Sequence, residues 1–149
     1  MSGHRRRITA MQALLVGTPV SRCPEYVDIH REFESVYEGR RIRNLRNRHL
    51  LQVVHSCRAL DTCLKAVLIQ DHQLAPNGMG SALYQLRDHG IRRTGRHLAE
   101  SLRRTHNASV ARIRNHYLHS AGAYPGNSTQ VDSLLTSMQS CLQDVIALL

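Results

Sequence analysis

Apolar residues recur along most of the chain at steps of three and four, the spacing that lines up one face of an α-helix. No alternation of apolar and polar residues lasts long enough between turn residues to predict a β-sheet. Helices of the expected length, joined by short loops, bury their apolar faces by packing against one another. The pattern therefore predicts an all-α protein, an antiparallel helical bundle of about four to six helices in a single domain over residues 1–149.

The first half of the chain predicts three helices. A first helix is expected over Arg5–Val16, and a second starts near Pro24, because proline is tolerated in the first turn of a helix. The second helix ends between Gly39 and Asn47. A third carries a continuous apolar stripe over residues 50–68 and ends before a Pro-Asn-Gly-Met-Gly segment.

The second half predicts two further helical stretches and a final long helix. The two stretches cover residues 81–87 and 96–117, with a pair of glycines separating them. A loop over residues 120–130 precedes the last helix, which starts at Val131. The residues expected in helical register on the inward face of the second stretch are Leu98, Leu102, Thr105, Ser109 and Ile113.

The charge of the chain predicts a polyanionic partner. The 149 residues hold 20 basic and 11 acidic side chains, which gives a net charge of +9. Every basic residue except Lys65 is arginine, whose planar guanidinium can bind a phosphate through two N–H groups. A GC-rich genome, which raises arginine content without any ligand, is the alternative explanation. After residue 119 the charged residues are Asp132 and Asp144, so the last helix is expected in the core or an interface.

Cysteine spacing and the lengths of the apolar runs indicate the compartment. The four cysteines have no Cys-x-x-Cys spacing and are expected to be reduced, buried side chains. No apolar stretch approaches the roughly 20 residues that span a bilayer, and the basic start at Met1–Arg7 lacks the apolar region of a secretory signal. We therefore expect a cytoplasmic protein that contacts no membrane and uses neither a metal nor another cofactor.

One short segment, Arg114-Asn115-x-x-x-His119-Ser120, is more informative than the arginine content. Several Arg–His pairs in the chain have four to six residues between them, about as many as this composition produces by chance. A requirement for asparagine after the arginine and a small residue after the histidine leaves only Arg114 and His119. The segment also lies at the predicted end of a long helix, before a loop and the final helix.

This segment resembles the motif of HEPN ribonucleases, in which four to six residues separate an arginine from a histidine and a polar residue often follows the arginine. It is most similar to the RiboL-PSP and toxin branches of that superfamily. HEPN domains are helical bundles that carry the motif before a final helix. The resemblance implies metal-independent RNA cleavage that leaves 2′,3′-cyclic phosphate and 5′-hydroxyl ends, by a homodimer in which two motifs meet. It also implies that Arg114, Asn115 and His119 are catalytic.

The residue types of the segment fit this chemistry. Without a metal, RNA cleavage needs a group that activates the ribose 2′-hydroxyl and a cation that stabilises the phosphorane-like transition state. His119 can exchange a proton near neutral pH, and Arg114 stays charged and can hold the phosphate. Asn115 can donate to a phosphate oxygen or fix one tautomer of the imidazole. His116 is a candidate for a second catalytic imidazole or for half of a metal site, although no third ligand has a matching spacing.

A basic surface leading to the motif is expected to bind RNA. The Arg40–Arg48 cluster is a separate basic patch in the sequence. Asp61 is expected at the surface, with the alternative that it orders an arginine of the site. The residues predicted to bind RNA are Arg92, Arg93, Arg96, Arg103, Arg104, Arg112 and, by stacking on a base, Tyr124.

The sequence thus predicts an endoribonuclease of HEPN type, a toxin or antiviral defence effector restrained by an antitoxin or another defence-complex protein. One alternative is a solvated helix end, where Arg and His complement the helix dipole without any catalysis. Another is a non-catalytic helical module that binds nucleic acid or a nucleotide. The last is an interaction subunit of a defence complex, whose acidic partner neutralises the arginines.

Overall fold

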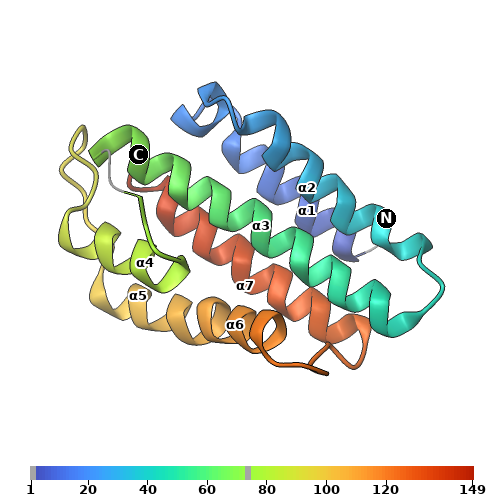
Figure 1. Ribbon diagram of the computed structural model, residues 1–149. Coiled ribbons are helices and arrows are strands. Elements are labelled where there is room, and N and C mark those ends of the chain that lie inside the picture. The colour runs from blue at the N-terminus through green and yellow to red at the C-terminus, as the bar shows by residue number, and fades with distance from the viewer. Residues whose placement is uncertain (1–2, 73–74) are drawn as a thin grey trace.

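A computed structural model describes residues 3–72 and 75–149, and it is built from helices (Figure 1). Within these residues there is no strand, and one isolated bridge pairs Ile91 with Arg96. The helices are α1 (Gly3–Leu15), α2 (Tyr26–Glu38), α3 (Leu45–His72), α4 (Met79–Asp88), α5 (Glu100–His106), α6 (Arg112–His119) and α7 (Ser128–Ile146). Shorter turns are η1 (Pro19–Arg22), η2 (Gly39–Arg41) and the π-helical η3 (Asn107–Ala111). The predicted all-α fold is confirmed.

Local side-chain chemistry sets several of the helix ends. The Asn127 side chain accepts a hydrogen bond from the backbone N–H of Gln130 at 2.9 Å, which caps the first turn of α7. Asn44 accepts from the N–H of Asn47 at 3.0 Å at the start of α3. Gly17 follows α1 with φ at 75°, a left-handed conformation that favours glycine. These caps satisfy backbone groups that have no partner within a helix.

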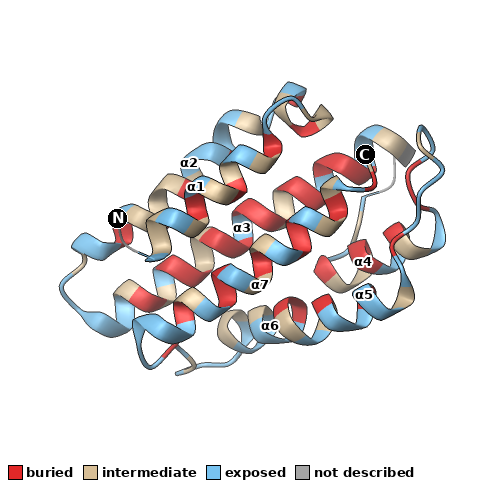
Figure 2. Ribbon diagram, turned by 180° about the vertical axis from the view of Figure 1, so that it is seen from behind, coloured by how far each residue is buried: buried red, intermediate tan, exposed pale blue. Residues whose placement is uncertain are grey.

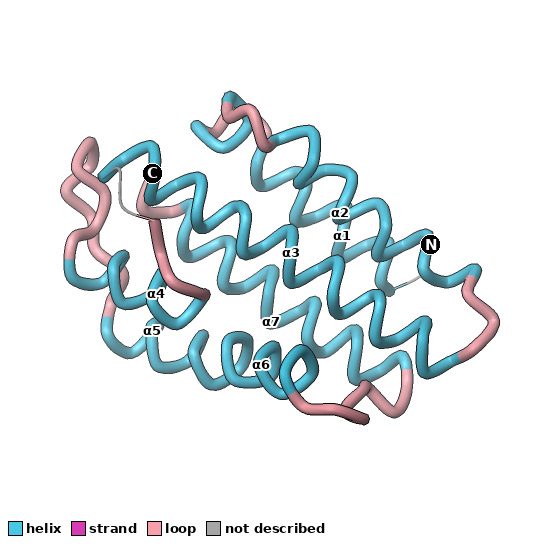
Figure 3. Tube along the Cα trace, in the orientation of Figure 1, coloured by secondary structure: helices cyan, strands magenta, loops and turns pink. Residues whose placement is uncertain are grey.

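The long helices α1, α2, α3 and α7 lie lengthwise beside one another, and α4 with α5 and α6 lies along the other side of the bundle (Figures 1 and 3). α2 runs antiparallel to α1 and α3, whereas α7 runs in the same direction as α1 and α3. The ring nitrogen Nδ1 of His49, near the start of α3, is 3.2 Å from the carbonyl oxygen of Pro125, just before α7. This contact places the starts of α3 and α7 at the same end of the bundle.

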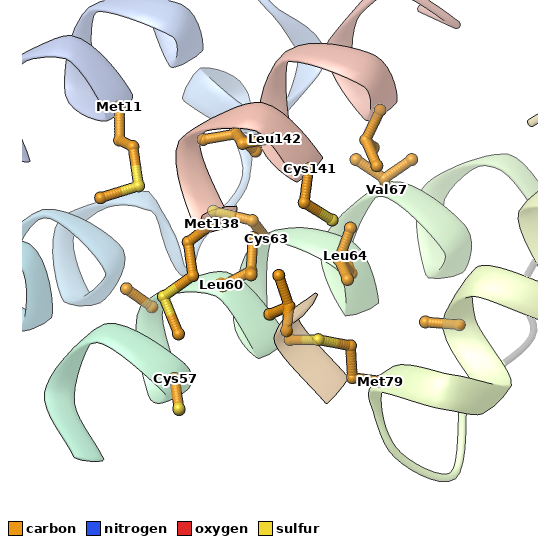
Figure 4. Packing of buried hydrophobic residues seen from close by; sticks show 14 of the residues in the cluster. Met11, Cys57, Leu60, Cys63, Leu64, Val67, Met79, Met138, Cys141 and Leu142 are labelled. Carbon is orange, nitrogen blue, oxygen red and sulfur yellow. The ribbon is translucent and has the colours of Figure 1, made fainter. Parts of the chain in front are cut away.

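The core lies between the long helices and α4, with buried residues along the middle of α3 and α7 (Figure 2). Figure 4 shows Leu60 and Cys63 of α3 gathered with Met138 and Cys141 of α7. The apolar stripes predicted on the third and last helices are therefore buried as expected. Each large apolar side chain buried in this way contributes on the order of 1.5–3 kcal/mol.

The four cysteines are free and buried, as predicted. Burial raises the pKa of Cys57 and Cys141 to about 12. These thiols are therefore protonated at neutral pH, and they act as small apolar side chains.

Several helix starts differ from the prediction, and α7 starts at Ser128 rather than at Val131. The second helix starts at Tyr26, so Pro24 precedes the helix rather than occupying its first turn. The stretch predicted from residue 96 becomes helical only at Glu100, because residues 91–96 form a tight turn. Gly90, with φ at 62°, permits this turn, since a Cβ there would lie 2.4 Å from the Arg96 carbonyl oxygen.

The inward face of α5 and α6 also differs from the prediction. Leu102 and Ile113, which were expected to face the core, are each 37% exposed. Arg103 and His106 are buried in their place, and the Arg114 side chain is 16% exposed. Burial of these polar groups is tolerated because each has a hydrogen-bond partner. The prediction failed because it placed apolar residues and small hydroxyl residues at the inward positions, and no charged residue.

Across the described ranges, no helix is both long and apolar enough to cross a membrane. The longest helix, α3, carries charged residues along its length, including Arg58, Asp61 and Lys65.

We predict that Leu135→Ala lowers the free energy of unfolding by about 2–5 kcal/mol, because Leu135 is fully buried on α7 and its loss leaves a cavity. Urea unfolding followed by circular dichroism at 222 nm measures this change. Leu45→Ala is the control, since Leu45 is 59% exposed and its loss is expected to change stability by about 0.5 kcal/mol or less. Equal losses in the two variants would contradict the placement of the core.

Candidate active site on α6

The motif predicted from the sequence lies on one long helical segment made of α5, η3 and α6. The π-helical turn η3 joins the two helices without a break in helical backbone conformation. Before this turn α5 packs against α4, whereas after it α6 packs against α3. A π turn holds an extra residue, which changes the direction in which the following side chains point.

Arg114 is fixed by a carboxylate from another helix. Its Nε donates to Asp61 Oδ2 of α3 at 3.0 Å, and its Nη2 donates to the same oxygen. Its Nη1 donates to Asn115 Oδ1 at 2.9 Å. A guanidinium has five N–H donors, so two of them, one on each terminal nitrogen, remain for a ligand. The sequence alternative in which Asp61 orders an arginine of the site is the arrangement observed.

Asp61 lies at the edge of a cavity beside Arg114. The cavity has a volume of about 240 Å³. Burial raises the pKa of Asp61 above its ordinary value, and the hydrogen bonds and charge of Arg114 offset only part of this effect. The second carboxylate oxygen, Oδ1, is buried and has no hydrogen-bond partner among the described residues. The cavity is lined by Asp61, Leu64, Lys65, Pro76, Gly78, Met79, Ala82 and Arg114.

The other motif residues are exposed. Asn115 and His119 are four positions apart on α6, so they share one face of the helix, and both are open to solvent. His116 belongs to the same exposed face, and its ring centroid lies 5.4 Å from that of Tyr117. Arg114 and His119 are separated by about 7.5 Å along the helix axis. Five residues also turn the helix by about 140° beyond one full turn, so the Arg114 side chain faces α3 while His119 faces solvent.

α6 ends directly after His119. Ser120 has an extended backbone, with φ at −106° and ψ at 113°, and the chain turns through Gly122 toward the start of α7. The loop then leads to Tyr124, whose ring is 43% exposed.

The predicted RNA-binding arginines do not form one continuous face. The Arg93 and Arg96 guanidinium groups donate to the carbonyl oxygens of Leu149 and Ala147 at the end of α7. They lie near the start of α5, roughly 30 Å along this helical segment from His119. Exposed Arg92 belongs to the same tight turn, so these three arginines are distant from the motif.

Arg103 and Arg104 bind a carboxylate on their own helix. Arg103 is 7% exposed and donates to Glu100, and its guanidinium stacks 4.2 Å from the centroid of the Tyr84 ring. Arg104 is exposed but also pairs with Glu100. The prediction that Arg103 lies on an open phosphate-binding surface is therefore corrected. Arg112, exposed on the face that carries Asn115 and His119, is the predicted arginine that lies beside the motif.

Sequence reasoning missed Arg46 as a neighbour of the site. Its guanidinium lies 5.2 Å from the centroid of the Tyr124 ring, in the loop that follows His119. Arg46 belongs to the cluster Arg40–Arg48, which had been treated as a separate patch. The contact brings the start of α3 next to the loop after the motif, and only the tertiary fold reveals this proximity.

Among residues 3–72 and 75–149, no group of three His, Cys, Asp or Glu side chains is arranged to hold a metal ion. No protein-family model, no curated protein and no solved structure matches the chain.

We predict that Glu100→Gln weakens the acid dependence of stability. Hydrogen bonds from Arg103 and Arg87 hold the pKa of Glu100 far below its ordinary value. Because this pKa is lowered in the folded state, Glu100 stabilises the fold above about pH 4.3, and this contribution is lost as the pH falls further. Urea unfolding between pH 7 and pH 3 should show a flatter decline for Glu100→Gln than for the wild type. An unchanged slope, or an equal change in the exposed control Glu25→Gln, would contradict this role.

Proposed function

We propose that the chain is a metal-independent endoribonuclease of HEPN type, with Arg114 and His119 at the centre of its active site. The Arg114 guanidinium is the main support for this proposal, because Asp61 and Asn115 hold it while two N–H donors stay open for a phosphate. An arginine that only complements a helix dipole needs no carboxylate from another helix. The same helix presents an exposed histidine five residues further on.

In the proposed reaction His119 removes the proton of a ribose 2′-hydroxyl. The 2′-oxygen then forms a bond to phosphorus, and the bond from phosphorus to the 5′-oxygen breaks. Arg114 stabilises the negative charge on the phosphate oxygens during this exchange. His116, on the same exposed face, is the candidate that protonates the departing 5′-oxygen. The products are a 2′,3′-cyclic phosphate and a 5′-hydroxyl.

We further propose a biological setting for this activity. In line with the resemblance, two copies pair so that their motifs meet, and the enzyme acts on cytoplasmic RNA as a toxin or antiviral defence effector. The net charge of +9 suits an acidic antitoxin or another defence-complex partner that restrains it.

We predict that His119→Ala lowers the rate of RNA cleavage by about 10²–10⁴-fold in the presence of EDTA, because general acid–base catalysis is lost. His119 is exposed and has no described partner, so the variant is expected to keep the wild-type unfolding curve. The measurement uses end-labelled RNA, and resistance of an oligonucleotide with a 2′-O-methyl group at the cleaved position tests the role of the 2′-hydroxyl. His30→Ala is the matched control, an exposed histidine on α2.

Wild-type activity that EDTA abolishes, or unchanged cleavage by His119→Ala, would overturn the mechanism. Salt-dependent RNA binding without new RNA ends would instead favour the non-catalytic binding module. In cells, growth inhibition by the wild type that equals that of His119→Ala would contradict a toxin.

We predict that Asp61 is a positioning residue for Arg114. Asp61→Asn should lower kcat by about tenfold or more with little change in KM, because the guanidinium loses its charged anchor and its fixed orientation. Asp61→Glu should restore part of kcat, since it returns the carboxylate. Arg114→Lys should not keep the wild-type activity, because an ammonium cannot bind a phosphate in the bidentate geometry of a guanidinium. Wild-type kcat in Asp61→Asn would show that the pair only supports the fold.

A further inference from the structure

A second polar cavity lies at the end of the bundle where α1, α3 and α7 begin. Its volume is about 430 Å³, within the size range of small-molecule sites. None of the motif residues of α6 lines it, so it is separate from the candidate active site. The residues that line it are Gly3, His4, Arg40, Arg48, His49, Gln52, Ser128, Thr129 and Asp132.

One side of this cavity is suited to an anion. Arg40 and Arg48 carry its positive charges, and neither forms a described pair with a carboxylate. The Arg40 guanidinium lies flat against the Tyr37 ring, 4.0 Å from its centroid, which holds it at the cavity. Ser128 and Thr129 form the first turn of the 19-residue α7, where backbone N–H groups have no acceptor within the helix.

Two buried polar side chains, Gln52 and His49, belong to the cavity wall. Gln52 is 1% exposed, and its Nε2 donates to the Val36 carbonyl oxygen, while its Oε1 has no hydrogen-bond partner among the described residues. His49 is 5% exposed, and its Nδ1 donates to the Pro125 carbonyl oxygen. An unsatisfied buried polar atom such as Gln52 Oε1 is rare in folded proteins, and a donor on a bound ligand would satisfy it.

The remaining charge at the cavity is the carboxylate of Asp132, whose Oδ1 is also buried without a described partner. A bare anion would meet repulsion from this group. A ligand that carries hydroxyl groups besides its anionic end can instead donate to Asp132 and to Gln52 Oε1. The cavity thus combines cations and helix N–H groups with hydrogen-bond acceptors that lie one helical turn further along α3 and α7.

We propose that this cavity binds a phosphate monoester that also carries hydroxyl groups, as in a sugar phosphate or the 5′-phosphorylated end of an RNA strand. The phosphate contacts Arg40, Arg48 and the first turn of α7, and the hydroxyls face Gln52 and Asp132. This site does not depend on the proposed ribonuclease activity, and binding can be measured in a protein that cleaves nothing.

Isothermal titration of the full chain with ribose 5-phosphate, ribose and inorganic phosphate tests the site. Ribose 5-phosphate should bind at least tenfold more tightly than either fragment, because only it combines a phosphate for the arginines with hydroxyl groups for Gln52 and Asp132. Thr129→Asp adds a carboxylate to the first turn of α7, where it favours the helix but repels a phosphate, so affinity should fall about tenfold or more in a folded protein. Arg40→Gln should also weaken binding.

The matched controls are Thr136→Asp, two turns further along α7, and Arg22→Gln in η1, and both should bind as the wild type does. Titration of the His119→Ala protein with an RNA oligonucleotide, once with and once without a 5′-phosphate, distinguishes the source of the ligand. Phosphate-dependent binding of RNA alone assigns the site to an RNA end, and binding of ribose 5-phosphate assigns it to a small metabolite. Absence of both, or equal losses in Thr129→Asp and Thr136→Asp, would overturn the proposal.

Discussion

The ion pair between Arg114 and Asp61 positions the candidate site relative to the helical bundle. It joins α6 to the middle of α3, and α3 packs against the long helices α2 and α7. Because a half-buried guanidinium is costly without a partner, the pair also determines which side of α6 faces inward. Asn115 and His119 then point to solvent by helix geometry alone. This one polar contact thus places Arg114 beside a cavity and leaves His119 exposed to solvent.

Much of the fold could be predicted because its apolar pattern is regular. The stripes on α3 and α7 have a consistent spacing, and their burial stabilises the bundle in the way the periodicity indicates. The α5–α6 segment was predicted less well. Its inward positions include Arg103, His106 and Arg114. The burial of His106 and Arg114 depends on Asp144 and Asp61, which are distant in the sequence. Periodicity describes apolar faces, and it does not identify a face that packs through hydrogen bonds.

The candidate site shows the same division. The sequence singled out Arg114, Asn115 and His119 from a local pattern, and their place at the end of a helix before α7 agrees with that pattern. The partner of Arg114 could only be named as an alternative, because Asp61 lies 53 positions away. The roles of the scattered arginines were still harder to predict. Guanidinium groups at Arg93 and Arg96 bind carbonyl oxygens near the chain end, a use of positive charge that composition does not distinguish from RNA binding.

The π turn at η3 makes the orientation of the site depend on helix type as well as on residue identity. A π turn absorbs one residue more than an α-helical turn, so the same sequence wound as unbroken α-helix would rotate everything after Ala111 by about 100°. Every residue of the motif would survive such a change, yet Arg114 would swing away from Asp61. A related chain without the π turn keeps the orientation of its motif when it is also one residue shorter between Glu100 and Arg114. In comparing such chains, that number of residues is as informative as the motif itself.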